Sequence, residues 1–387
     1  MLQRQSTLRL SIRNVAGAAV AFAVLAGAWR SHYLATMQGN PTAALQSVGL
    51  GVLCLWTASR LQLGFCLVVG LALRLLVPVE VLYYPGSVIA VLGLSGFCGF
   101  CLLVYRAVTT GNRELFRVIL PALIFLALSV MLADLLKLAI QRTTHRYDLE
   151  IYAMDNATWN GFGPFFGRLI VPHPWAANVE EIVYAALPGV MILVFAFYTY
   201  RRRNFAIDLL GLYLTMAISG FLLYFVAPAC GPIYAFGSSF PFSLPPVRTA
   251  KLANDILQHA PNAMPSLHFA NALILYLNSK PWRSLHIFTL AFMILTAVAT
   301  LGSGEHYVTD LVVAVPFAVA LQLLFSSYRF AAALPTLLVS IWFLAITKAG
   351  VGDTPHWMLW TLTLGSLACP VLLYRRSGLV SVHPPSR

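Results

Sequence analysis

The chain has 387 residues, of which 59% are hydrophobic and only 10% are charged. Soluble domains usually carry about 25% charged residues, so this composition excludes a soluble protein and predicts an integral membrane protein. The formal net charge of +12 lies mainly between apolar runs, so the basic residues indicate membrane topology and do not point to nucleic-acid binding.

Long apolar windows predict transmembrane helices, because roughly 17–25 apolar residues cross a hydrocarbon core about 30 Å thick. The windows lie near residues 14–29, 43–58, 61–78, 86–105, 117–140, 182–200, 205–227, 265–281, 285–301, 306–325, 331–347 and 357–374. The predicted fold is therefore an all-α polytopic transmembrane helical bundle of about twelve spans. Most basic residues fall on the inner side if both termini are cytoplasmic, which agrees with the positive-inside rule.

The N-terminal region, residues 1–116, contains no pattern that indicates chemistry. Its first window ends near Ala26-Gly-Ala28, which is similar to a cleavable signal peptide, although an uncleaved helix also fits the topology. Cys98 and Cys101 have the spacing of a redox or metal motif, but the apolar run offers no other ligand. This favours small residues for helix packing.

Two long segments, 141–180 and 228–264, lie on the outer side in this topology. Both are rich in proline, glycine and aromatic residues. Such sequences suit re-entrant or interfacial structure over a pocket, and they equally suit simple anchoring at the membrane surface. The first segment also holds a sequon at Asn156, which matters only in a glycosylating host.

The window 265–281 opens with the sequence Met264-Pro265-Ser266-Leu267-His268. Pro265 and Ser266 are typical of a helix start, with Ser266 as the N-cap and His268 in the first turn. The unpaired N–H groups of that turn form a natural anion site. A phosphate held there would have His268 beside it, and an imidazole with a pKa of about 6.5 is suited to act as a general acid.

The window 306–325 opens with a second histidine, His306, four residues before Asp310. On a helix this spacing brings the two side chains within reach. The carboxylate can then accept the proton of one ring nitrogen, which leaves the other nitrogen as a nucleophile or base. The neighbouring Glu305 can orient a hydroxyl acceptor or tune the histidine, or it is a plain interfacial carboxylate. Together, the two histidines favour a catalytic site over simple packing, because ionisable groups in membranes usually mark function.

These residues carry a resemblance. Pro265 to His268, followed one helix later by His306-Tyr-Val-Thr-Asp310, resembles the second and third signature motifs of the type 2 phosphatidic acid phosphatase superfamily. The branch concerned includes the inositol phosphorylceramide synthases and related bacterial membrane proteins. The resemblance implies that His306 is the nucleophile, Asp310 its partner and His268 the acid, with no metal or other cofactor. It also implies a six-helix catalytic core over 117–325, with transmembrane helices before it (1–116) and after it (326–387).

The sequence departs from the family at the groups that hold phosphate. The family's Lys-x6-Arg-Pro motif is missing, and Thr300 stands where an arginine precedes the nucleophile by six residues. A phosphoryl group needs fixed hydrogen-bond donors around its oxygens, so cationic residues on the predicted outer side are candidates for binding the phosphate. These candidates are Lys137, Arg142, Arg146, Arg168, Arg248 and Lys251, together with Ser266 at the helix start. Lys137 can instead pair with Asp134 one turn away, and Arg248 and Lys251 can be simply solvated.

The sequence thus predicts a membrane lipid phosphotransferase that acts on the extracytoplasmic side of a plasma or inner membrane. It would move a phosphoryl-polyol headgroup through a phosphohistidine, as the resemblance to inositol phosphotransferases implies. A lipid or polyprenyl phosphate phosphatase is the main alternative. A transporter that relays protons or binds an anion through the same residues is the third, but its groups would be expected near the membrane midplane.

Overall fold

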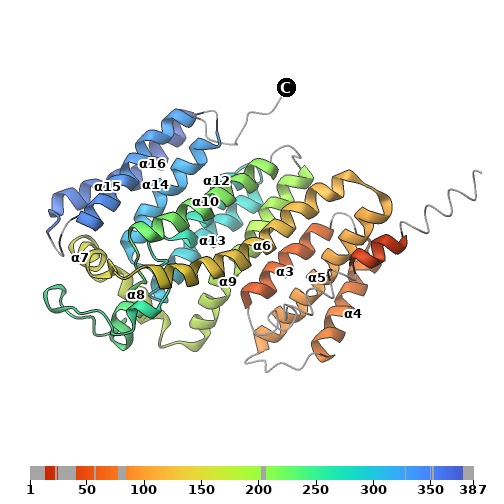
Figure 1. Cartoon of the computed structure of the whole chain (residues 1–387), viewed down its shortest axis with the longest axis horizontal. Coiled ribbons are helices and arrows are strands. Elements are labelled where there is room, and N and C mark those ends of the chain that lie inside the picture. Colours follow the sequence, from red (N-terminus) through yellow and green to blue (C-terminus); the bar gives the residue numbers. More distant parts are fainter. Residues whose placement is uncertain are drawn as a thin grey trace, which may run out of the picture. The chain divides into compact units, whose positions relative to one another are not determined.

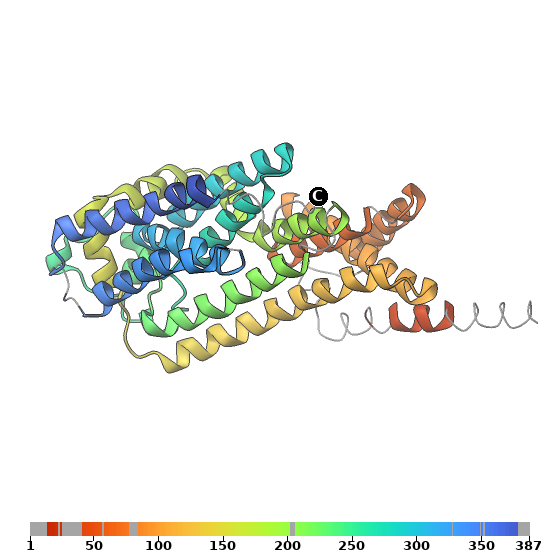
Figure 2. The same ribbon diagram turned by 90° about the horizontal axis from the view of Figure 1, so that it is seen from above.

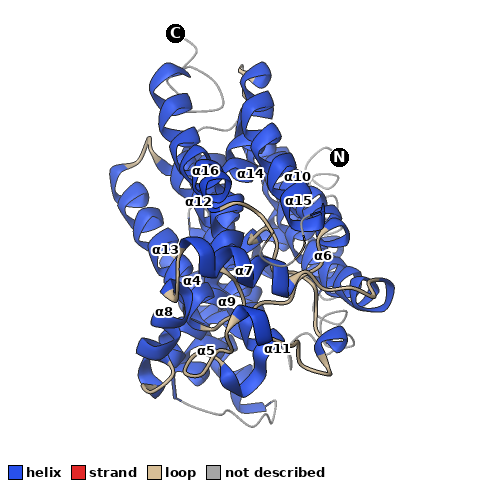
Figure 3. Ribbon diagram, turned by 90° about the vertical axis from the view of Figure 1, so that its left-hand side faces the viewer, coloured by secondary structure: helices blue, strands red, loops and turns tan. Residues whose placement is uncertain are grey.

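The structure is a computed structural model that describes residues 14–21, 24, 41–55, 58–76, 84–201, 206–326, 328–348, 350 and 353–377. Within these residues it consists of helices and loops, without strands (Figure 3). The predicted all-α class is thereby confirmed. Of the predicted first span, 14–29, the structure describes residues 14–21 and 24, which are helical, whereas Ala26-Gly-Ala28, on which the signal-peptide alternative rests, lies outside the described residues.

The chain divides into two compact units, one of Met1–Ser129 with Ala185–Ala206 and one of Val130–Tyr184 with Ile207–Arg387. The first unit contains helical residues 14–21, and its labelled helices are α3 (Pro41–Leu55), α4 (Arg60–Leu76), α5 (Tyr84–Thr110) and parts of α6 (Arg113–Arg142) and α9 (Pro174–Arg201). Helix α3 packs closely on α5: their backbones approach so closely that a Cβ on Gly51 would lie only 2.6 Å from the Cα of Gly96. Small residues allow such close approach between membrane helices.

The cysteines of α5 lie in this packed region. Cys98 and Cys101 are free and partly buried. Across the described part of the chain, no group of three or more His, Cys, Asp or Glu side chains could hold a metal ion.

The second unit holds the segments that carry the histidines. Its elements are the rest of α6 and α9 with α7 (Asp148–Thr158), α8 (Phe162–Ile170), α10 (Ala206–Val226), α11 (Pro232–Phe236), α12 (Leu267–Ser279), α13 (Arg283–Gly302), α14 (Val308–Leu324), α15 (Ala333–Lys348) and α16 (His356–Ser377). Short 3₁₀ turns occur at Gly237–Ser239, Val247–Thr249, Ile256–Gln258 and Arg329–Ala332. The three-part domain division of the sequence analysis stays a prediction.

Helix α14 is the core of the second unit. All its residues from Val308 to Leu323 are buried, as expected for a helix that is apolar on every face. It contacts α7, α12, α15 and α16, and Figures 1 and 2 show α14, α15 and α16 side by side. The N-terminus of α14, where His306 and Asp310 lie, is therefore surrounded by other elements.

The twelve predicted spans are not confirmed. Among the described residues, five helices are long and apolar enough to cross a membrane: Val88–Thr110, Pro174–Arg201, Asp208–Val226, Arg283–Gly302 and Arg329–Lys348. The predicted window 265–281 forms a helix of only 13 residues, or about 20 Å at 1.5 Å per residue. Hydropathy located this segment, but its helix is too short to cross about 30 Å of hydrocarbon.

Candidate functional site

His306 lies in the loop between α13 and α14, and its side chain is only 2% exposed. Its Nδ1 is 2.9 Å from the carbonyl oxygen of Ala263 and 3.5 Å from Oδ2 of Asp310. A carbonyl oxygen can only accept a hydrogen bond, so Nδ1 must carry the proton. The lone pair of the neutral imidazole is then on Nε2. Sequence analysis predicted the contact with Asp310 but missed the Ala263 carbonyl, which is the closer partner.

Asp310 caps the helix that carries it. Its Oδ2 accepts a hydrogen bond of 2.7 Å from the backbone N–H of Tyr307, which closes a capping box at the start of α14. Its Oδ1 is buried and has no hydrogen-bond partner. The carboxylate thus fixes the first turn of α14 and stays close to the His306 ring.

Asp155 holds the same helix end from outside. Its Oδ2 accepts from the N–H of Val308 at 2.8 Å, and its Oδ1 accepts from the N–H and the hydroxyl of Thr309. These are N–H groups that a helix cannot satisfy internally, and a carboxylate also favours the positive end of the helix dipole. Helix α7, which carries Asp155, therefore positions the residues that follow His306.

Asp148 lies two turns before Asp155 on α7 and is fully buried. Its carboxylate accepts from the N–H groups of Cys230 and Gly231 and from the hydroxyl of Tyr307. Burial raises the pKa of both carboxyls, Asp148 and Asp155, to about 6, against the lowering effect of these hydrogen bonds. Sequence analysis missed both residues. The two carboxylates are seven residues apart and therefore lie on one face of a helix, which is the pattern by which the sequence could have indicated them.

Replacing Asp148 by asparagine is expected to destabilise the protein by about 1–3 kcal/mol at pH 7, because one of the two acceptor oxygens becomes an NH2 group that is buried beside other hydrogen-bond donors. The pKa of Asp148 in the folded protein, about 6, exceeds the usual unfolded value of about 3.9. Between these pH values the folded state binds more protons than the unfolded state. Protonation of Asp148 therefore stabilises the folded protein at low pH, and this stabilisation is lost as the pH rises through about 6. As the pH falls from 6 to 4, the thermal stability of the wild type should rise relative to that of Asp148→Asn. Parallel pH profiles in detergent would contradict this assignment.

Arg146 supports the loop that passes over Asp148. Its side chain is 3% exposed, and its guanidinium donates to the Cys230 sulfur and to the carbonyl oxygens of Thr143, Leu257 and His259. Through these contacts Arg146 connects the two predicted outer segments, 141–180 and 228–264.

His268 and Ser266 open α12 as predicted from the sequence. Ser266 is the N-cap, and its hydroxyl oxygen accepts from the N–H of Phe269 at 3.4 Å. Its own N–H donates to the carbonyl of Asp310 at 3.3 Å, which ties the start of α12 to α14. Burial, and to a smaller extent the charge of His306, lowers the pKa of the His268 imidazole to about 3. The structure thus brings the two histidine motifs together.

An aromatic ring and a carboxylate complete the surroundings of His268. The ring of Tyr184 stacks on His268 with centroids 3.8 Å apart and an interplanar angle of 26°. The hydroxyl of Tyr184 interacts with the carboxylate of Glu305, which also accepts a hydrogen bond of 3.4 Å from Tyr234. Glu305 is therefore linked to both histidines, by sequence to His306 and through Tyr184 to His268.

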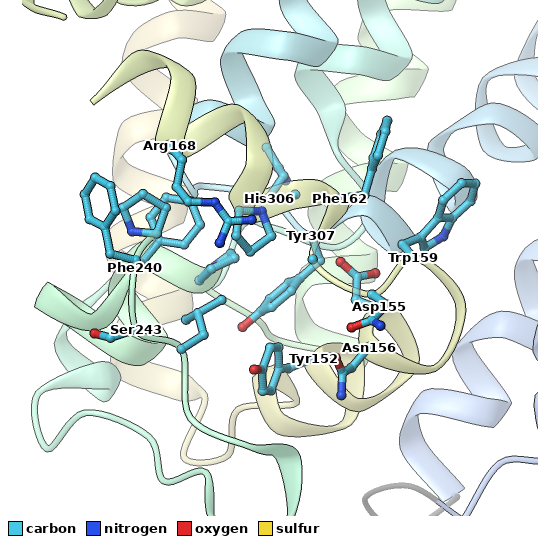
Figure 4. Close-up of a pocket in the computed structure, with 18 residues that line it drawn as sticks. Tyr152, Asp155, Asn156, Trp159, Phe162, Arg168, Phe240, Ser243, His306 and Tyr307 are labelled. Carbon is cyan, nitrogen blue, oxygen red and sulfur yellow. The ribbon is translucent and has the colours of Figure 1, made fainter. Parts of the chain in front are cut away.

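A cavity of about 200 Å³ opens onto His306 (Figure 4). Its walls come from α7, α8, the Phe240–Leu244 segment and the start of α14, so both predicted outer segments line it. Arg168 of α8 is among the lining residues, and Figure 4 shows its side chain extending toward His306. This arrangement places a cation and an imidazole in one pocket.

The other predicted cations lie elsewhere. Lys137 pairs with Asp134 at 3.0 Å, and both side chains are exposed. Arg142, Arg248 and Lys251 are exposed too. These four are not among the described residues that line the His306 cavity. Their predicted role in binding substrate stays a prediction.

Comparison with known proteins gives one match. No curated protein and no solved structure matches the chain. The model of the PAP2 superfamily matches residues 149–324, a segment that contains His268, His306, Asp310 and the cavity, but not Asp148. Members of that superfamily are phosphatases and phosphotransferases. Residues 149–324 are therefore similar to a PAP2 superfamily domain, compatible with a membrane lipid phosphatase or phosphotransferase.

Proposed function

We propose that this protein is an integral-membrane phosphotransferase that moves a phosphoryl-polyol headgroup between lipid substrates at the extracytoplasmic face. The observation that carries the proposal is the hydrogen bond from Nδ1 of His306 to Ala263. It leaves Nε2 as the basic nitrogen of a residue that lines a cavity together with a cation. A histidine oriented in this way is suited to attack an electrophilic phosphorus.

The reaction would proceed in two displacements. Nε2 of His306 attacks phosphorus, the bond from phosphorus to the leaving lipid oxygen breaks, and His268 protonates that oxygen. A hydroxyl group then attacks the phosphohistidine, His268 takes its proton, and the bond from phosphorus to Nε2 breaks. Asp310, close to Nδ1, would stabilise the positive charge that His306 acquires.

The role of His268 as the acid requires that it gains a proton when the substrate binds. In the free protein, burial and secondarily the nearby His306 lower the pKa of the His268 imidazole to about 3, so the imidazole is neutral at pH 7. A bound phosphate group would bring negative charge beside it and favour protonation, and the stacked ring of Tyr184 would stabilise the resulting cation.

Arg168 is the proposed phosphate clamp, because it lines the cavity with His306. Hydrogen bonds to charged groups contribute about 1.5–3 kcal/mol, so Arg168→Met is expected to lower kcat/KM roughly 10- to 100-fold. Arg168→Lys should keep the charge and recover part of the activity. Arg142→Met makes the same change at an exposed arginine outside the cavity. A larger loss in Arg142→Met than in Arg168→Met would move the clamp to Arg142.

The test of the function is product analysis with the purified full-length protein in phospholipid nanodiscs. A phospholipid with a polyol headgroup, labelled in its phosphate group, is incubated with and without an acceptor lipid that carries a free hydroxyl group, and the products are identified by mass spectrometry. Transfer predicts the labelled phosphoryl-polyol group on the acceptor lipid and an acid-labile, base-stable label on the protein. Release of the polyol phosphate alone from this donor, or of inorganic phosphate from a labelled lipid phosphate monoester, would favour the phosphatase alternative, in which water resolves the intermediate. No turnover of any labelled lipid would overturn both.

A further inference from the structure

Helix α8 carries a row of large apolar side chains that the protein leaves exposed. Phe162, Phe165 and Leu169 are spaced i, i+3 and i+7, so they share one face of the helix. Val171 and Trp175 continue this apolar stripe beyond the end of the helix, and Trp175 is 70% exposed. Apolar side chains gathered on a surface in this way mark a site of contact with another protein or with a membrane.

The opposite face of α8 packs on the elements that form the His306 site. Gly163, Gly167 and Ile170 of this face are buried. A Cβ on Gly167 would lie 2.7 Å from the Cβ of Pro241, and a Cβ on Gly302 would lie 2.3 Å from Cδ1 of Ile170. These close contacts fix the rotation of α8 about its own axis, so the apolar stripe faces away from the protein.

Two apolar helices have an end beside α8, and they fix its level relative to a bilayer. Helices α9 and α13 are both long and apolar enough to cross a membrane. Helix α9 begins at Pro174, four residues after α8 ends at Ile170, and α13 ends at Gly302, which contacts Ile170. Because the ends of spanning helices lie at the membrane surface, α8 lies at that surface as well. The apolar stripe therefore meets lipid.

The residue types of the stripe suit the boundary between lipid headgroups and acyl chains. Aromatic residues, above all Trp, are enriched at that boundary, and an amphipathic helix lies there with its apolar face buried about 5–10 Å. Phe162 and Arg168 of α8 also line the His306 cavity (Figure 4). The apolar stripe thus reaches the rim of the cavity, and the depth of α8 in the bilayer sets the depth of the Arg168 cation.

We propose that α8 is an interfacial helix whose apolar stripe inserts into the adjacent phospholipid leaflet and holds the rim of the His306 cavity at the level of the lipid phosphates. The partner of this surface is the acyl-chain boundary of the leaflet. Insertion does not depend on the proposed function. Its consequence for the turnover of lipids rests on that function, so the two are tested separately.

Insertion is tested without turnover, by photocrosslinking of the full-length protein in phosphatidylcholine nanodiscs. The variant is Phe165→p-benzoylphenylalanine, and the matched control is Leu257→p-benzoylphenylalanine. Leu257 is 45% exposed, against 47% for Phe165, but it lies between the exposed polar residues Asp255 and Gln258. After illumination, mass spectrometry should find about 10-fold more acyl-chain adduct at position 165 than at position 257. Equal lipid adducts at the two positions, no lipid adduct at position 165, or crosslinks from position 165 to a second copy of the protein in place of lipid would overturn the proposal.

The consequence for turnover is tested with Leu169→Glu, which places a carboxylate in the stripe. Two substrates are compared: a long-chain phospholipid in the bilayer and a short-chain analogue dissolved as monomers. Relative to the soluble analogue, kcat/KM for the bilayer lipid should fall about 10-fold, mainly through KM, because a charged group resists insertion. Leu169→Phe and Leu257→Glu should keep the wild-type ratio of the two substrates. Equal losses on both substrates would overturn the link between insertion and the cavity. If the wild type turns over neither substrate, the proposed function fails, and the crosslinks still decide whether α8 inserts.

Discussion

Replacing His306 by alanine is expected to abolish turnover of a labelled phospholipid, with a loss on the order of 10⁴-fold or more. The residue would supply the nucleophile itself, so removal of the imidazole leaves no group to form the bond to phosphorus. A lipid phosphate with an activated leaving group should not rescue this variant, because such a leaving group replaces the acid and not the nucleophile. His268→Ala should, in contrast, recover much of its activity with that substrate.

The control for this experiment is His173→Ala, since His173 is an exposed histidine of the same unit that contacts Trp175. It should retain wild-type turnover. Substantial activity in His306→Ala, with correctly folded protein, would remove His306 from the role of nucleophile. Recovery of neither variant by the activated substrate would argue against the separate role of His268.

Replacing Gly231 by alanine is expected to reduce turnover about 100-fold or more while the protein remains folded. Gly231 has a φ of +97°, and a Cβ there would lie 2.2 Å from the carbonyl oxygen of Glu305. The backbone just before His306 would have to move, and a misplacement of about 1 Å at a catalytic group can cost about 10²-fold. The substitution acts on the histidine without touching its side chain.

Gly237→Ala is the matched control for the backbone conformation. Gly237 also has a positive φ, +54°, but a Cβ at this position would meet nothing within 4 Å. Both variants therefore carry the strain of a left-handed alanine, on the order of 1–3 kcal/mol, and only Gly231→Ala carries the clash. Turnover is measured at matched amounts of folded protein. Equal losses in the two variants would show that the contact with Glu305 does not position His306.

The structure explains why the sequence could place the two histidines at helix starts. Ser266 caps its helix through a bond to a residue three positions later, and Asp310 lies one turn beyond His306. These relations are local, so the spacing of side chains along a helix is enough to predict them. The same holds for the apolar windows, which are local averages of hydropathy.

The lengths of the helices, and which of them span the membrane, were less predictable from the sequence. A hydropathy window shows where the chain is apolar, but not whether the surroundings of that segment are lipid or protein. Helix α14 is apolar over its whole length because it is buried among α7, α12, α15 and α16, and α12 is too short to span. Helices in the core of a bundle and helices that face lipid have similar compositions.

The sequence by itself determined that this is an all-helical membrane protein with two histidines at helix starts, because both properties follow from neighbouring residues. Only the tertiary structure decided what surrounds the histidines. The proton on Nδ1 of His306 is fixed by a carbonyl 43 residues away, and the end of α14 is held by a carboxylate 154 residues from Thr309. Contacts between such distant residues depend on how the helices pack, and spacing along the chain carries no information about them.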